Sequence, residues 1–495
     1  MSLQDQLTQI HQNSRAVALD RYRKEKLHSI SFLYDRTYAA TQDYESIFSE
    51  SLVALDKLEI LDSRFSKFRD TIFSEFSLRI DREAQTKEQE ENLGKTIDAF
   101  LSMLSPYWHL AISVKAAEWP LRRFSMNIYN SEYLLLCSLP YYDQPIFERM
   151  LYVIPVLPPM FQWLQGFKRS GKCPTNSTIK RAFCDETFLN LYSKFLIKEV
   201  SHSNVYRREL VFFTSMLIMA IASLSASNSK ELSNVIALSL EASSALMDST
   251  GNESKISAYT ILAVISSAVP LSRDVIVASI DTILTTLNGK LTASALKCIL
   301  KLYQTIQTDS LDALPLSVFN KLPDSLLKDY QDIIFSTGMN GSFLTAYIRA
   351  ALKAQSIIIE VVDVLDSVQN FNITTKAFSL IEEDALSIVK NDAHNSENYV
   401  PLFRYLLDRD EAQFRKIVNK AHLTVSDLEL LLHATILDRN AEDETFVDAE
   451  EDNEVESFDS VSGNITEGKP EGYQSLVSDT VSFLSSDKQT AQTFF

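Results

Sequence analysis

Two short stretches decide the fold: NVIALSL at residues 234–240 recurs as DVIVASI at 274–280, an offset of 40 residues. Downstream, KISAYTIL at 255–262 recurs as KLTASALK at 290–297, an offset of 35 residues. Apolar residues spaced three and four apart predict amphipathic helices, so each copy is a helix, a polar turn and a second helix. One such pair cannot bury its apolar face alone, so neighbouring pairs must stack. We therefore predict an all-α, HEAT- or armadillo-like α-solenoid.

The composition supports the same fold class. Gly accounts for 10 and Pro for 13 of the 495 residues, about 2% and 3%, against usual levels of about 7% and 5%. Tight βα turns, hairpins and phosphate-binding loops need Gly at positive φ. The shortage of Gly argues against Rossmann folds, P-loop folds and β-sandwiches, and it leaves helices joined by short polar connections.

Composition also divides the chain into four parts. Residues 1–44 are expected to be a basic, partly helical N-terminal segment, and residues 45–437 a continuous solenoid of helix pairs. Residues 438–472 are expected to be a disordered acidic linker, because 438–459 hold 11 acidic residues and one arginine. Residues 473–495 have apolar residues at helical spacing and are expected to be a short amphipathic helix that starts further solenoid.

Two local patterns give further expectations. Phe65, Phe68, Ile72, Phe73 and Phe76 are spaced as the core stripe of a helix. Seven prolines are expected to set helix boundaries between residues 100 and 160, at positions 106, 120, 140, 145, 155, 158 and 159.

The stretch 210–229 carries no charged residue and is barely long enough to cross a bilayer. It is rich in Ser, and the segments that follow repeat the same helical pattern with charges restored. We interpret it as a buried solenoid helix and expect no membrane partner.

The sequence contains no recognisable catalytic or cofactor-binding motif. The sequence lacks the phosphate-binding, dinucleotide-binding, zinc-protease and nucleophile-elbow motifs. Its seven histidines show no ligand-like pairing at i, i+4, and its four cysteines lie far apart. We predict a protein that is not an enzyme and has no cofactor or metal site.

Clusters of basic residues stand out because the formal net charge of the chain is −18. The densest cluster lies within 166–181, where five cations occur without an acid. Such groups can neutralise RNA phosphates or contact an acidic protein surface, and both alternatives stay open. The candidate partner or RNA contacts are Arg21, Arg23, Lys24, Lys26, Arg122, Arg123, Lys168, Arg169, Lys172, Lys180 and Arg181.

Four long strings resemble one protein family. They are VALDRYRKEKLHSISFLYDRTYAATQDYESIF at 17–48, DREAQTKEQ at 81–89, AAEWPLRRF at 116–124 and NSEYLLLCSLPYYDQPIFERML at 130–151. They are similar to the N-terminal region of the large HEAT-repeat U3 small nucleolar RNA-associated protein of the UtpA (t-UTP) subcomplex of the small-subunit processome, a relative of HEAT repeat-containing protein 1. The positions that match its fingerprint are Leu27, His28, Ala40, Thr41, Gln42, Asp43, Tyr44, Glu118, Trp119, Arg122, Arg123 and Phe124.

The resemblance implies a nucleolar, non-enzymatic scaffold for 18S pre-rRNA processing. It implies assembly of UtpA on the 5′ external transcribed spacer, a link to ribosomal DNA transcription, and partners among WD-repeat UtpA subunits and the U3 ribonucleoprotein. Because family members are several-fold longer, it also implies that this chain is the N-terminal portion of a longer protein. The alternative is a HEAT-type transport or trafficking adaptor, which shares the fold class.

The acidic linker yields a first test. Deleting residues 440–470 is expected to leave the melting temperature unchanged within a few degrees. The segment has too few apolar residues to offset an ordering cost of about 1–2 kcal/mol per residue. A large drop in a thermal melt would show instead that the segment packs on the rest of the protein.

Overall fold

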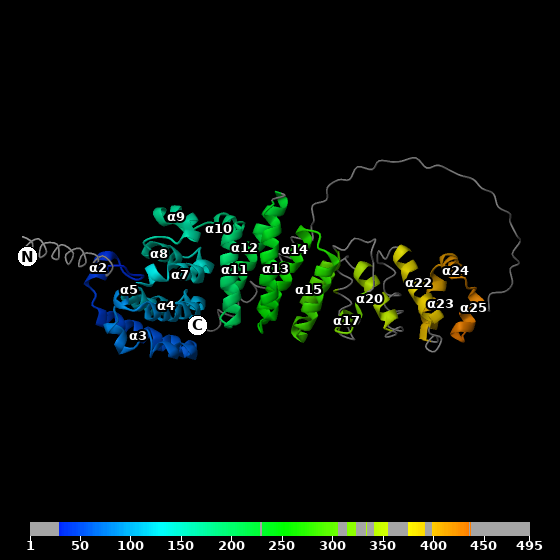
Figure 1. Cartoon of the computed structure of the whole chain (residues 1–495), viewed down its shortest axis with the longest axis horizontal. Coiled ribbons are helices and arrows are strands. Elements are labelled where there is room, and N and C mark those ends of the chain that lie inside the picture. The colour runs from blue at the N-terminus through cyan, green and yellow to red at the C-terminus, as the bar shows by residue number, and fades with distance from the viewer. Residues whose placement is uncertain are drawn as a thin grey trace, which may run out of the picture. The chain divides into compact units, whose positions relative to one another are not determined.

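The fold is all-α, as predicted: within the residues that the structure describes, every regular element is a helix and no strand occurs (Figure 1). The computed structural model describes residues 29–227, 230–304, 314–322, 333, 341–354, 375–391, 398–434 and 436. The predicted acidic linker at 438–472 and amphipathic helix at 473–495 lie outside these ranges.

The chain divides into two compact units, Met1–Val269 and Pro270–Phe495, and the boundary falls between the two copies of the repeat. The predicted continuous solenoid over 45–437 stays a prediction. The helices of the first unit are α2 (Arg36–Thr41), α3 (Tyr44–Leu61), η1 (Ser63–Phe68), η2 (Glu75–Arg79), η3 (Arg82–Ala84), α4 (Lys87–Leu104), η4 (Ser105–Tyr107), α5 (Ala111–Phe124), α6 (Met126–Tyr129), α7 (Ser131–Ser138), η5 (Leu139–Tyr141), α8 (Pro145–Val153), η6 (Pro159–Leu164), α9 (Gln165–Ser170), α10 (Asn176–Phe183), α11 (Glu186–Ser201), α12 (Arg207–Ala226), α13 (Leu232–Asp248) and α14 (Asn252–Ala268).

The first unit opens with α3 packed along α5. Asp43 begins α3 by accepting a hydrogen bond from the Ser46 backbone N–H at 2.6 Å, which satisfies one of the donors that a helix start leaves open. Trp119 on α5 is fully buried and donates from its indole Nε1 to the Ile72 carbonyl at 2.8 Å. The Phe48 ring of α3 meets the Trp119 ring edge-on at 4.9 Å. This contact closes the core at the N-terminal end of the unit.

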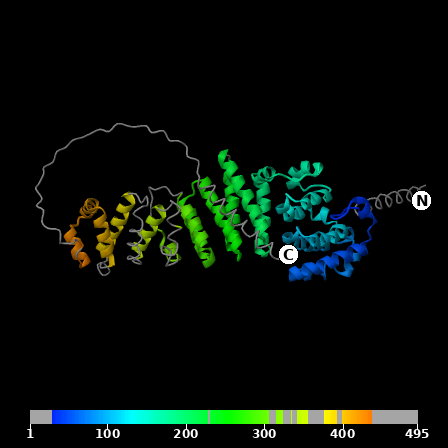
Figure 2. The same cartoon turned by 180° about the vertical axis from the view of Figure 1, so that it is seen from behind.

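The later helices of this unit stack as the repeat predicts. Helix α11 packs on α13, and α12 packs on α10, α13 and α14. Each of these helices therefore contacts an adjacent helix in the chain and a helix two places away in the chain. This is the packing of stacked helix pairs. Figures 1 and 2 show α11 to α14 side by side from opposite directions. The first copy of the repeat occupies α13 and α14, as predicted.

Two local expectations need correction. The phenylalanine stripe does not form one α-helix: Phe65 and Phe68 lie in the 3₁₀ helix η1, and a turn leads to η2. Phe76, in η2, is 70% exposed, so it is not in the core. Pro120 does not set a boundary but lies inside α5 and is buried. Proline removes one backbone donor there, and the surrounding packing outweighs the loss.

The apolar stretch 210–229 lies largely in α12. By length and composition this helix could cross a membrane, and 61% of its most apolar window is buried inside the protein. Leu217, Ile221 and Phe213 are at most 1% exposed, as in the core of a helical protein. Burial by neighbouring helices accounts for its composition.

In the second unit the stacking pattern continues. Helix α20 packs on α16 and α22, and α22 packs on α24 and α25. The second copy of the repeat occupies α15, η7 and α16, which confirms the prediction of helices there. The helices of this unit are α15 (Arg273–Thr285), η7 (Gly289–Leu291), α16 (Thr292–Gln304), α17 (Leu316–Phe319), α20 (Gly341–Lys353), α22 (Thr375–Asn391), α23 (Val400–Arg409), α24 (Glu411–Lys420) and α25 (Val425–Leu432).

Two carboxylates are buried in the first unit near the start of α12. Glu209 occupies the third position of this helix, is 2% exposed, and accepts a hydrogen bond from the backbone N–H of Tyr206, which precedes the helix. Glu199 on α11 is 4% exposed and accepts hydrogen bonds from the hydroxyls of Ser102 and Tyr133. Burial, and secondarily the nearby Glu199, raises the pKa of Glu209 well above its usual value near 4.5. Folding therefore favours the protonated form of Glu209.

Because Glu209 is buried, we predict that Glu209→Gln increases the stability of the fold in a pH-dependent way. A carboxyl whose pKa is raised by folding stabilises the fold below its unfolded pKa, and the contribution is lost as pH rises through the folded pKa. We expect the Gln variant, which can still accept from Tyr206, to be more stable than the parent at pH 8 by about 1 kcal/mol or more, since one pKa unit corresponds to about 1.4 kcal/mol.

Urea unfolding at pH 4 and pH 8 measures the effect. The gain should shrink at pH 4, where Glu209 is protonated in both states. Glu50→Gln, at an exposed position of α3, is the matched control and should show no such gain. Equal stabilisation at both pH values would contradict the assignment.

Candidate interaction surface

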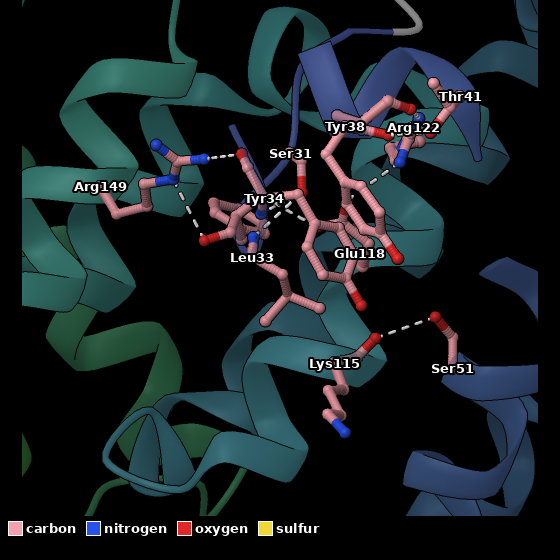
Figure 3. A network of polar contacts seen from close by, with 12 residues as sticks. Ser31, Leu33, Tyr34, Tyr38, Thr41, Ser51, Lys115, Glu118, Arg122 and Arg149 are labelled. Carbon is pink, nitrogen blue, oxygen red and sulfur yellow. Dashed lines mark hydrogen bonds and ion pairs between the residues drawn. The ribbon is translucent and has the colours of Figure 1, made fainter. Parts of the chain in front are cut away.

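The segment that precedes α2 is held by contacts to its backbone (Figure 3). The Arg149 guanidinium of α8 donates to the carbonyl oxygens of Phe32, at 3.1 Å, and Tyr34. The Ser31 hydroxyl accepts hydrogen bonds from the backbone N–H groups of Leu33 and Tyr34 at 3.0 Å each. These contacts hold a stretch without regular secondary structure against two helices.

A buried ion pair on α5 completes the attachment. The Glu118 carboxylate accepts from the Phe32 backbone N–H at 2.9 Å, and Arg122 donates to the Ala39 carbonyl oxygen. The two charged groups lie 3.6 Å apart, at 3% and 5% residue exposure. Burial raises the pKa of Glu118, while its hydrogen bonds and Arg122 favour the ionised form. We call Glu118, Arg122 and Arg149, with the backbone of residues 31–39, the anchor network.

Several fingerprint residues lie in or beside the anchor network. Trp119 and Phe124 pack against each other at 6.3 Å, and Tyr44 meets Trp119 edge-on at 6.3 Å. Glu118 and Arg122 belong to the anchor network itself (Figure 3). Leu27 and His28 lie outside the described residues. Tyr44, Trp119 and Phe124 thus pack α3 on α5, while Glu118 and Arg122 hold α2 and the segment before it.

This position corrects one predicted contact residue. Arg122 is buried and its guanidinium points inward, so it is not available to RNA or a partner protein. Arg123 is half-buried: it donates to the Ser77 carbonyl oxygen at 3.1 Å and lies 5.4 Å from the centre of the Tyr44 ring. Both arginines serve the fold. The candidates Arg21, Arg23, Lys24 and Lys26 lie outside the described residues.

The cluster at 166–181 splits into two kinds of residue. Lys168 is half-buried, and its Nζ donates to the carbonyl oxygens of Ile154 and, at 2.9 Å, Pro155. Desolvation lowers its pKa. Lys168 therefore has a structural role, which sequence reasoning assigned to a partner contact.

The remaining four cations face solvent more fully. Arg169, Lys172 and Arg181 are exposed and Lys180 is half-exposed. None of the four forms an ion pair with a carboxylate in the part of the chain that the structure describes. Arg169, Lys180 and Arg181 occupy the last turns of α9 and α10, where positive charge also favours the helix. We call these four residues the α9–α10 cations.

Sequence reasoning missed Arg149 and Arg36. Both guanidinium groups lie over the exposed ring of Tyr152, at 5.0 and 5.3 Å from its centre. Arg149 and Tyr152 are three positions apart on α8, but Arg36 comes from α2, over a hundred positions away, so no local pattern could connect it to them. The described residues contain no group of three or more His, Cys, Asp or Glu side chains that could hold a metal ion.

With this geometry in view, comparison with known proteins is informative. Residues 231–351 match the family model of U3 small nucleolar RNA-associated protein 10. That protein from Candida glabrata is 35% identical over 453 residues, which cover 89% of this chain and 25% of the relative. The Saccharomyces cerevisiae protein of the same name is 35% identical over 441 residues, 88% of this chain and 25% of the relative. The Candida albicans protein is 42% identical over 288 residues, 56% of this chain and 16% of the relative. The chain spans about a quarter of the length of the first two relatives.

The anchor network predicts the effect of removing Arg149. Arg149→Ala is expected to destabilise the first unit by about 3 kcal/mol or more, because two charge-assisted hydrogen bonds are lost, each worth about 1.5–3 kcal/mol. Residues 29–42 should also become accessible to protease. Limited proteolysis and urea unfolding measure both effects.

Arg36→Ala is the matched control, because it removes the other cation over Tyr152, and the Arg36 side chain donates no hydrogen bond to the described residues of the segment. It should cost no more than about 1 kcal/mol. Equal effects of the two variants would show that the Tyr152 contacts, rather than the backbone hydrogen bonds, hold the segment.

Proposed function

We propose that this chain is a non-enzymatic scaffold that acts in ribosome biogenesis with the U3 ribonucleoprotein. The observation that carries the proposal is the similarity over 88–89% of the chain to two relatives named U3 small nucleolar RNA-associated protein 10. The stacked helices support it, since solenoids offer extended surfaces to several partners. The proposed compartment is accordingly the nucleus and nucleolus.

In finer terms, we propose that the chain helps assemble UtpA on the 5′ external transcribed spacer of pre-rRNA. Its partners would be other UtpA subunits, including WD-repeat proteins, and the U3 ribonucleoprotein, with a link to ribosomal DNA transcription. This level of detail rests on the family resemblance of the N-terminal strings, which cover the anchor network.

Purification of the tagged chain from its own cells tests the proposal. U3 small nucleolar RNA and 5′ spacer RNA should be enriched over a tagged control protein. Enrichment of nuclear pore or coat proteins without these RNAs would overturn the proposal in favour of a transport adaptor.

For the α9–α10 cations we propose contact with an acidic protein surface rather than with RNA bases. Proteins that bind single strands interleave cations with exposed aromatic rings. Trp163, the nearest tryptophan in sequence, is half-buried and packs against other rings: its ring meets Phe188 edge-on at 5.5 Å and stacks near Phe161 at 6.4 Å. Cations that are not interleaved with exposed aromatic rings suit a complementary acidic protein surface better than single-stranded RNA.

A fourfold replacement by Glu distinguishes the two ligands. Changing Arg169, Lys172, Lys180 and Arg181 should slow association with a UtpA partner and leave RNA retention unchanged. Lys168 is left intact because it holds backbone carbonyls. If the cations meet RNA instead, binding to many sequences should weaken alike, and the salt dependence of the affinity should become shallower.

The control carries the same charge change at four exposed residues elsewhere in the first unit, namely Lys57, Lys67, Arg79 and Lys87. It should affect neither interaction. If the α9–α10 variant also changes neither, the four cations are not a contact site.

A further inference from the structure

A second surface is formed by the backbone segment that Lys168 contacts. Residues 153–160, with the sequence VIPVLPPM, connect α8 to the start of η6, and we call them the proline corner. Ile154 and Leu157 are 0% and 2% exposed and fix the corner to the core. Val156, between them, is 77% exposed, which places an aliphatic side chain in solvent at a bend of the chain.

The backbone of the corner is held by side chains of the body. Prolines have no backbone N–H, so the corner has few local donors for its carbonyl oxygens. Lys168 supplies two, to the carbonyl oxygens of Ile154 and Pro155. Gln162 donates to the Leu157 carbonyl oxygen at 2.6 Å. Polar side chains of α9 and η6 thus fix the path of the corner.

This rigidity distinguishes the corner from an ordinary loop. Proline fixes φ at three of its positions and restricts the preceding residues to extended conformations. The backbone that carries Val156 is therefore fixed, and two further exposed residues lie four positions before and after it in the chain, Tyr152 and Met160, which are 45% and 39% exposed. A preorganised apolar surface loses little conformational entropy on binding, and this smaller loss increases affinity.

Cations border the corner. Arg36 and Arg149 lie over the Tyr152 ring, and α9, which carries the exposed Arg169, packs on both α8 and η6. Glu148 is the carboxylate of α8, with Oε1 3.4 Å from the position of a Cβ at Gly171. On α2, α8 and α9 together, the cations Arg36, Arg149, Lys168 and Arg169 therefore outnumber the one carboxylate.

We propose that the proline corner is a docking site for a protein whose surface offers an apolar pocket for Val156 with carboxylates at its rim. Tyrosine and arginine beside an aliphatic anchor are the residue types that dominate binding energy in protein interfaces. RNA offers no pocket for an aliphatic knob, and a single valine is too small an anchor for stable membrane binding, which needs two signals. The proposal goes beyond the proposed function and does not depend on it.

A photo-crosslinking residue at position 156 tests the contact. The full chain, with p-benzoylphenylalanine in place of Val156, is irradiated in cells of its own organism, and the adducts are identified by mass spectrometry. The same residue in place of Val53, 55% exposed on α3, is the control. One protein should be crosslinked from position 156 and not from position 53. Adducts to RNA or lipid, or the same adducts from both positions, would overturn the proposal.

The second measurement is the affinity of the chain for the purified partner that crosslinking identifies. Val156→Asp should weaken binding about ten-fold or more, as for an interface hot spot, and Val53→Asp should change it less than about two-fold. Val156→Lys should bind better than Val156→Asp, because its charge suits an acidic rim. Unchanged affinity of Val156→Asp, or the reverse order of Lys and Asp, would overturn the proposal. Because Val156 is exposed, unchanged melting temperatures verify that the variants fold.

Discussion

No helix pair in this chain can bury its apolar face alone, and the architecture follows from that constraint. Helix α12 shows it most clearly, because it is apolar enough to enter a membrane and is instead covered by α10, α13 and α14. Each added helix removes apolar area from water at about 25 cal/mol per Å². Both units meet the constraint in the same way, with each helix shared between two neighbours.

Polar side chains hold the places where helix stacking is interrupted. Between α8 and η6, and before α2, the chain runs without a helix, so its carbonyl oxygens have no ladder partners. Lys168 and Gln162 supply donors to the first stretch and Arg149 to the second, while Arg122 donates to the Ala39 carbonyl oxygen inside α2. Buried backbone groups must be paired, and long cationic side chains reach them from an adjacent helix. Arg122, Arg123 and Lys168 therefore serve the fold.

The positions of the repeat helices could be predicted from the sequence. Whether a charged side chain points into the protein or into solvent could not. The 40-residue offset between 234 and 274 predicted helices that the structure contains, because periodicity reports directly on which face is buried. Arg122 and Arg169 look alike in sequence, since each lies in a pair of adjacent cations, yet one is buried and the other exposed. Their difference arises from segments 83 and more positions away, such as Ala39. The 3₁₀ helices at 63–79 escaped detection because aromatic spacing does not distinguish i+3 from i+4 hydrogen bonding.

The anchor network also has a consequence for the order of events during synthesis. Phe32 and Arg149 are 117 positions apart, and Arg122 follows Ala39 by 83. A chain that emerges from the ribosome N-terminus first presents residues 31–39 long before their partners exist. For that interval Phe32 has neither the Glu118 carboxylate nor the Arg149 guanidinium to bind. The N-terminal end of the first unit is thus completed only after α8 has emerged, so the segment made first is among the last to reach its final place.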